Sequence, residues 1–163
     1  MKDVLTYPNE TLREVCAVVQ DDEFGSSMEV FVQELWEIME EEEGVGLAAP
    51  QIGVLKNILV YRTMGEEREE LAYLINPRIV KTEGKTMNEE GCLSIPGVFA
   101  KVERFKKIIV EGQDFYGEPT LKETEVFSSV IIQHESDHLV GKLFVDRLSL
   151  IKRKLLLAKY SRQ

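Results

Sequence analysis

One short segment constrains this chain more than any other, because it places the only two histidines directly after an apolar run. His134 and His138 are four residues apart, so on a helix both imidazoles lie on one face and can reach a single ion. The apolar residues 130–132 before them predict a buried helix over about residues 128–139. Glu135 would lie beside such an ion without having to bind it, which is the position that a general base requires. The alternative is a helix with two partly buried histidines and surface carboxylates, since a five-residue pattern can arise by chance.

A catalytic metal site usually has three protein ligands and one open position for water, so a third ligand is needed. The candidates are Cys92, Cys16 and a carboxylate. Cys92 lies in residues 89–97, a stretch with two glycines and a proline that is typical of a loop and could face a cleft. Cys16 has apolar neighbours and is predicted to be a core residue. Cys92 could instead be a nucleophile paired with one histidine, but that leaves the second histidine and Glu135 without a role, and ligation explains more.

Composition and charge limit the class of protein. The chain has 163 residues, enough for one domain with a sizeable core, and its 44% hydrophobic and 30% charged residues are typical of a folded protein. A net charge of −9 speaks against sequence-specific or general nucleic-acid binding, which requires a basic surface. No segment is long and apolar enough for a signal peptide or a membrane span, so no membrane association is expected. Two cysteines are too few for a disulfide framework, and we therefore expect a cytoplasmic protein with reduced thiols.

The hydrophobic pattern predicts helices near both ends of the chain and strands between them. A helix is expected from residue 28 to about residue 42, with Ser26 and Glu29 as a capping box and Gly44 at its end. A short helical turn could occupy residues 12–16, and a last helix is expected to begin after Ser149 as its cap. The predicted strands are 57–61, 71–75, 78–82, 99–103, 108–113 and 121–126, the last two joined by a hairpin connection at 114–119.

These elements predict a single α+β domain over residues 1–163, with short antiparallel or mixed β-sheets packed around a central helix that carries His134 to His138. The carboxyl-terminal helix, at about residues 149–163, contains five basic residues and no acidic one. It could contact an anionic partner locally, or it could simply present a solvated face.

Three motifs make the chain resemble the peptide deformylases. They are Gly-Val-Gly-Leu-Ala-Ala-Pro-Gln at residues 44–51, Glu-Gly-Cys-Leu-Ser at 90–94 and Gln-His-Glu-Ser-Asp-His at 133–138, in the family's order and at similar spacing. The similarity covers nearly the whole chain, and the three motifs together are more specific than the third alone. One departure is Ser136, where the family more often has a larger apolar residue; it removes no reactive group.

The resemblance implies a hydrolase that removes the formyl group from the N-terminal formylmethionine of nascent peptides and releases formate. It implies one divalent ion on Cys92, His134 and His138, usually Fe²⁺, with Zn²⁺, Ni²⁺ or Co²⁺ able to replace it. It also implies that Glu135 is the acid–base residue, and that the Gln51 amide and the backbone N–H of Leu93 stabilise the oxyanion. On sequence alone Gln51 could equally be a simple turn residue. The resemblance further implies these residues around the substrate and its methionine: Gly46, Val45, Phe127, Val130 and Ile131, of which the last three are equally good core residues.

Further expectations concern groups behind the ligands and the partner of the basic tail. Arg104 and Asp137 could form an ion pair, and Glu90 could orient a ligand histidine; a plain structural salt bridge is the alternative for each. The basic carboxyl-terminal helix could dock on ribosomal RNA, as in some deformylases.

Two other functions are alternatives for a chain with this helical motif. A zinc peptidase with the same helical motif would need a third His or Glu ligand downstream, but the residues after His138 contain no histidine and a single carboxylate, Asp146. A catalytically silent metal-binding or ribosome-docking module would be expected to lack Glu135 or Gln51, and both are present.

Overall fold

Two long strands form most of the sheet in the computed structural model, which describes residues 3–64 and 69–161. Within these two ranges the sheet has five strands in sequence order, and each of the four pairings is antiparallel. The strands are β1 (Gly46–Ala48), β2 (Ile58–Met64), β3 (Glu69–Cys92), β4 (Ile95–Gln113) and β5 (Pro119–Glu125). The α+β class and the antiparallel alternative are therefore correct, whereas the expectation of several short sheets, or of mixed ones, is wrong.

The sequence suggested a break at Pro77, but β3 continues through it. The register shifts between Ile75 and Arg78, and Asn76 has a positive φ of 50°. Such an irregularity lets a strand contain a proline that cannot donate to the ladder. The Asn76 side chain holds the bend by accepting from the backbone N–H of Val19 at 2.8 Å and donating to the Gln113 side chain at 2.7 Å. Two predicted strands thus become one.

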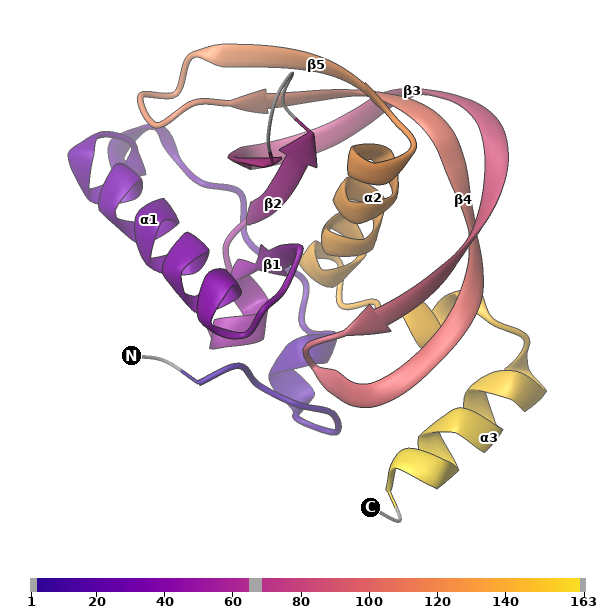
Figure 1. The fold of residues 1–163 in the computed structure, drawn as a ribbon. Coiled ribbons are helices and arrows are strands. Elements are labelled where there is room, and N and C mark those ends of the chain that lie inside the picture. Colours follow the sequence, from indigo (N-terminus) through magenta and orange to yellow (C-terminus); the bar gives the residue numbers. More distant parts are fainter. Residues whose placement is uncertain (1–2, 65–68, 162–163) are drawn as a thin grey trace.

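A second correction concerns the stretch around Cys92, which was expected to be a loop. Cys92 is the last residue of β3 and pairs with Ile95, the first residue of β4, so only Leu93 and Ser94 form the turn. The long β3–β4 hairpin bends around α2, and its turn lies near the end of the molecule that carries α3 (Figure 1). The position of the cysteine is therefore set by strand pairing within the hairpin.

In the described part of the chain three α-helices accompany the sheet, close to the predicted ranges. They are α1 (Ser26–Glu41), α2 (Phe127–Leu139) and α3 (Leu150–Tyr160), and the short 3₁₀ helices are η1 (Glu10–Arg13), η2 (Asp21–Glu23), η3 (Ala49–Ile52) and η4 (Phe144–Arg147). Ser149 caps α3 as expected, its hydroxyl accepting from the backbone N–H of Lys152. The helical turn expected at residues 12–16 lies earlier, at η1, because Val15 pairs with Val140 and the Cys16 N–H donates to the carbonyl of Leu139.

The start of α1 also differs from expectation. Ser26 is already inside the helix, and the N-cap is Gly25, with a φ of 121° and no side-chain capping bond. The Gly25 N–H donates to the carbonyl of Phe115 at 2.7 Å, and its own carbonyl accepts from Met28 at 3.0 Å. The capping box of Ser26 and Glu29 is therefore wrong, because a backbone contact with the β4–β5 connection sets the start of the helix.

The alternation of side chains along β2 places α1 and α2 on opposite faces of the sheet. Ile58 and Val60 pack in the cluster that contains α1, whereas Leu59 and Tyr61 pack in the cluster that contains α2. Successive residues of a strand point to opposite faces, so one strand can serve two cores. A third cluster joins the β3–β4 turn to η4 and the inner side of α3. Within the described parts of the chain, no helix combines the length and apolar composition needed to cross a bilayer.

Candidate active site

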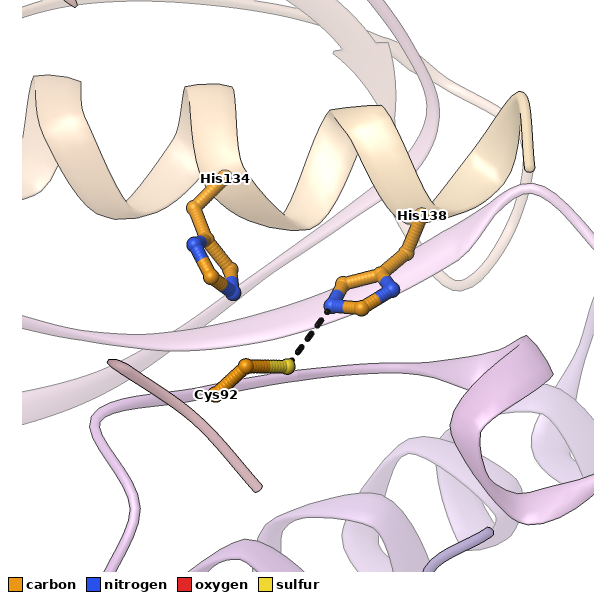
Figure 2. Close-up of side chains that lie close together, drawn as sticks. All are labelled: Cys92, His134 and His138. Carbon is orange, nitrogen blue, oxygen red and sulfur yellow. Dashed lines mark hydrogen bonds between the residues drawn. The ribbon is translucent and has the colours of Figure 1, made fainter. Parts of the chain in front are cut away.

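Three donor atoms from two elements meet beneath α2. His134 and His138 come from successive turns of that helix, and Cys92 comes from the end of β3. One donor atom of each lies within 4.8 Å of the others, and the Cys92 Sγ is 3.4 Å from Nε2 of His138. Figure 2 shows both rings and the thiol turned toward a common point. A thiolate and two imidazoles at this separation fit a single divalent ion, so the predicted convergence of Cys92 with the histidines is confirmed.

The turn after Cys92 is fixed by Gln51. The Gln51 Oε1 accepts from the backbone N–H of Ala48 at 2.9 Å, so its Nε2 faces the turn. That nitrogen lies 3.1 Å from Oγ of Ser94 and 3.7 Å from Sγ of Cys92. Gln51 is 1% exposed. It is therefore a buried residue that joins η3 to the donor cluster and does more than shape a turn.

Glu90 and Arg104 lie directly behind the first histidine. The Nδ1 atom of His134 is 2.7 Å from Oε1 of Glu90, which leaves Nε2 free to face the cluster. Arg104 donates to both oxygens of Glu90, at 2.8 Å each, and to Asp137 at 2.7 Å. Burial by itself raises the pKa of Glu90, but the hydrogen bonds from Arg104 and His134 hold this pKa below its ordinary value. Glu90 is therefore an ionised acceptor that contacts the ring of His134 and also forms the ion pair with Arg104 that was the alternative.

Glu135 is a buried carboxylate, and one of its oxygens makes no hydrogen bond to the described residues. It is 4% exposed, and its Oε2 has no hydrogen-bond partner among the described residues. Burial raises the pKa of Glu135 to about 6, and the two neighbouring histidines oppose part of that effect. A buried polar atom without a partner requires an explanation, and here it adjoins the donor cluster and a cleft. A water or substrate group beside the cluster would give it a partner.

A cleft of about 660 Å³ opens onto this cluster. Its walls contain all the residues predicted to be catalytic or to bind substrate, and two of the three predicted ligands. These are Val45, Gly46, Gln51, Cys92, Leu93, Phe127, Val130, Ile131, His134 and Glu135. His138 lies deeper, at 1% exposure.

Several residues at the site were not singled out from the sequence. Phe99 lines the cleft and is largely exposed, with its ring against the backbone of Gly91. Arg147 holds Asp137 from the other side, at 3.0 Å and 2.5 Å. Alternation along β4 could have pointed to Phe99, whereas nothing in the sequence links Arg147 to the site.

Two remaining expectations concern Cys16 and Ser136. Cys16 is buried, and burial raises the pKa of its thiol to about 11, so its assignment to the core is confirmed. Ser136 is half-buried beside the donors, and its Oγ has no partner in the part of the chain that the structure describes.

Comparisons with known proteins agree with this geometry. The sequence model of the polypeptide deformylase family matches residues 1–154. A peptide deformylase from Hydrogenovibrio crunogenus is 43% identical over 161 residues, which cover 99% of this chain and 94% of that protein. The structure of a Legionella pneumophila peptide deformylase superposes with a TM-score of 0.89 at 37% identity, over 99% of this chain and 94% of that one. An Acinetobacter baumannii peptide deformylase with Met-Ala-Ser bound has a TM-score of 0.85 at 28% identity, over 91% and 98%.

The fold and the site define a hydrolase with a cysteine and two histidines that could hold a metal ion. The chain belongs to the polypeptide deformylase family. It is thus an enzyme that removes the formyl group from an N-terminal formylmethionine.

Proposed function

We propose that this chain hydrolyses the formyl amide with one divalent ion held by Cys92, His134 and His138. The observation that carries the proposal is the convergence of these three donors within 4.8 Å, next to the buried carboxylate of Glu135, whose Oε2 has no hydrogen-bond partner among the described residues. A bound ion of this kind lowers the pKa of a coordinated water toward about 7 and polarises a carbonyl oxygen. The chain's own residues must then position the substrate and move the proton.

Glu135 is the proton carrier in this proposal. Its Oε2 accepts a proton from the attacking water while the water oxygen forms a bond to the formyl carbon. Glu135 then returns the proton to the nitrogen of methionine as the carbon–nitrogen bond breaks. The products are formic acid and a free amino terminus, and transfer of the acid proton to the amine gives formate and the ammonium ion, so atoms and charges balance. The raised pKa of Glu135, at about 6, suits a group that must both accept and donate near neutral pH.

Gln51 and Leu93 are proposed to stabilise the negative oxygen of the intermediate. The acceptor end of the Gln51 amide is occupied by the backbone of Ala48, so the donor end faces the cluster. Leu93 follows Cys92 directly in the turn and lines the cleft, where its backbone N–H could donate to the same oxygen. Losing one such donor typically costs about 3 kcal/mol of transition-state stabilisation.

The substrate is proposed to lie between β1 and the first turns of α2. Gly46 and Val45 form one wall of the cleft, and Phe127, Val130 and Ile131 form another. Together these walls are apolar, which suits a methionine side chain. The Met-Ala-Ser bound to the Acinetobacter baumannii enzyme supports a short methionyl peptide as the ligand.

We propose Fe²⁺ as the ion in the cell, with Zn²⁺, Ni²⁺ or Co²⁺ as functional or purification-dependent substitutes. One thiolate and two imidazoles suit all of these metals, so the donor set by itself does not select among them. We propose the cytoplasm as the location because formylmethionyl chains are made there and because the Cys92 thiol must stay reduced.

Formate release tests the reaction. Protein purified without oxygen should contain about one divalent ion per chain and should release formate from formyl-Met-Ala-Ser. The Glu135→Gln variant should keep the metal and lose turnover, because an amide cannot accept the proton. Loss of metal together with turnover would contradict the acid–base role and would place Glu135 among the ligands.

A second proposal concerns α3. We infer that this helix binds the ribosome. Its outer side exposes Leu150, Ile151 and Leu155 next to lysines 152, 154 and 159. Basic side chains on an otherwise acidic protein favour an anionic partner such as ribosomal RNA.

Co-sedimentation with ribosomes tests this contact. The triple change of lysines 152, 154 and 159 to glutamine should weaken co-sedimentation and its salt dependence, while activity on free formyl-Met-Ala-Ser stays unchanged. Unchanged co-sedimentation at low salt would overturn the ribosome contact and leave the deformylase activity intact.

A further inference from the structure

We infer that Arg147, a residue outside the cleft, is a positioning residue for His134. It acts through three buried side chains, Asp137, Arg104 and Glu90, which together reach the ring of His134. The inference rests on the proposed role of His134 as a metal ligand.

The chain of contacts begins at the surface. Arg147 donates through Nη2 to Oδ1 of Asp137 at 2.5 Å and through Nε to Oδ2 at 3.0 Å. Both oxygens of Asp137 are therefore held by one planar guanidinium, which fixes the orientation of the carboxylate as well as its charge. The side chain of Arg147 is 45% exposed, whereas that of Asp137 is 8% exposed.

The next contacts run through the interior. Arg104 uses one nitrogen for Asp137 and two for Glu90, and Glu90 accepts from Nδ1 of His134. The side chains of Arg104 and Glu90 are 3% and 6% exposed. A guanidinium group is rigid and planar. The position of Asp137 therefore affects where Arg104 can place its two hydrogen bonds to Glu90.

Charge balance explains why a second arginine is needed. Glu90 and Asp137 are two buried carboxylates, and Arg104 supplies one positive charge between them. Arg147 supplies the second charge and brings the four groups to neutrality. Without Arg147, Asp137 would be a buried carboxylate with Arg104 as its single charged partner among the described residues, and it would compete with Glu90 for Arg104. Glu90 would then hold the His134 ring less firmly.

Arg147 is itself held in place by its own segment. It ends η4, where the preceding residue, Asp146, forms ion pairs with Arg13 of η1 and Arg153 of α3. The same short helix places the ring of Phe144 against His134, with centroids 6.0 Å apart and planes 23° from parallel. The η4 segment therefore supports His134 both by a ring contact and by the ionic chain that starts at Arg147.

Binding of Co²⁺ to the metal-free protein tests the inference. Removing a partner directly behind a ligand typically weakens metal affinity about 10- to 100-fold, and Arg147 acts at a greater distance, so we expect about 3- to 10-fold for Arg147→Gln. The Arg147→Lys variant keeps the positive charge but lacks the planar guanidinium that binds both oxygens of Asp137. It should recover part of the lost Co²⁺ affinity. Arg78→Gln is the matched control, because Arg78 also donates through two nitrogens to a carboxylate, that of Glu111, but at the surface.

Histidine NMR of the metal-free protein gives a readout that does not depend on the ion. With only two histidines in the chain, the Nδ1 proton of His134 is readily assigned. In Arg147→Gln this proton should exchange faster with solvent, and in Arg78→Gln it should not.

The inference is overturned if both Arg147 variants bind Co²⁺ within twofold of the parent and keep the parent's proton exchange, whatever happens to their melting temperatures. If Arg147→Gln does not fold, Arg147→Lys decides by the same criteria. A parent protein that does not bind Co²⁺ would overturn the proposed metal site instead, while the proton exchange would still report on the role of Arg147.

Discussion

A Cβ atom added to Gly46 would lie 2.5 Å from Oε1 of Glu135, so the backbone of β1 and the carboxylate on α2 are in direct contact. The same atom would lie 2.8 Å from Cγ2 of Ile131, one turn earlier on the helix. A side chain at position 46 is thus excluded by two residues of α2. The glycine is required here by this close approach, since it allows the Glu135 carboxylate to reach the cleft.

Replacing Gly46 with alanine should therefore reduce catalysis more than stability. The added methyl group must displace the Glu135 carboxylate or the first part of α2, and a misplacement of about 1 Å can lower turnover about 100-fold. The measurement is kcat for formate release, normalised to folded protein. Gly112→Ala is the control, because its Cβ would meet Leu74 and the carbonyl of Ile75 at 3.2 Å, away from the cleft. Equal loss of kcat in both variants would contradict a specific effect on Glu135.

The Gln51→Glu variant tests the donor end of the Gln51 amide while it keeps the acceptor end. The new carboxylate can still accept from the backbone N–H of Ala48, but it has no N–H to donate toward the cluster. We expect kcat/KM to fall about 100-fold, in line with the loss of one oxyanion donor. Ser94→Ala removes only one acceptor of the Gln51 amide and should lower kcat/KM much less. A Gln51→Glu enzyme within a few-fold of the parent would exclude the donor role.

Cys16 should make the free energy of unfolding depend on pH in the alkaline range. Burial raises the pKa of its thiol from 9.0 to about 11 in the folded chain, so the unfolded chain loses this proton first. A group with a raised folded pKa contributes its full stability below about pH 9 and loses it as pH rises toward about 11. Urea unfolding between pH 8 and pH 10.5 should show a decline that is shallower in Cys16→Ala. Identical slopes would show that Cys16 is not the source.

Arg104→Leu should destabilise the fold strongly. It leaves the buried carboxylate of Glu90 without its cation and removes one of the two cations that hold Asp137. Breaking a buried ion pair by removing one partner typically costs about 3–5 kcal/mol. Arg78→Leu, which removes an exposed pair on the same β3–β4 hairpin, should change stability by less than about 1 kcal/mol. Urea unfolding of the two variants gives the comparison, and a similar small loss in both would argue against a buried network.

Predictions of local structure were correct where the residues that determine it lie within a single helix or strand. The α2 helix was expected from its apolar run, and its spacing alone placed both imidazoles on one face. Ser149 was correctly expected to cap α3. Burial of Cys16 followed from its apolar neighbours. In each case residues within a few positions of one another were sufficient.

The errors arose where distant segments decide the local structure. A proline after Asn76 suggested the end of a strand, but contacts with Val19 and Gln113 hold a bend through which β3 continues. The capping box at Ser26 was displaced by a backbone bond from Gly25 to Phe115. Such contacts are between residues far apart in the sequence, so local propensity does not predict them.

The sequence by itself determined the chemistry of the site: which side chains could ligate an ion, which could carry a proton, and which family the motifs resemble. Only the tertiary structure decided the placement of those groups. Cys92 reaches the histidines because the β3–β4 hairpin bends around α2, and Arg147 joins the site because η4 returns to Asp137. Residue identity sets what a group can do, whereas long-range packing sets which groups meet, and no local pattern encodes that meeting.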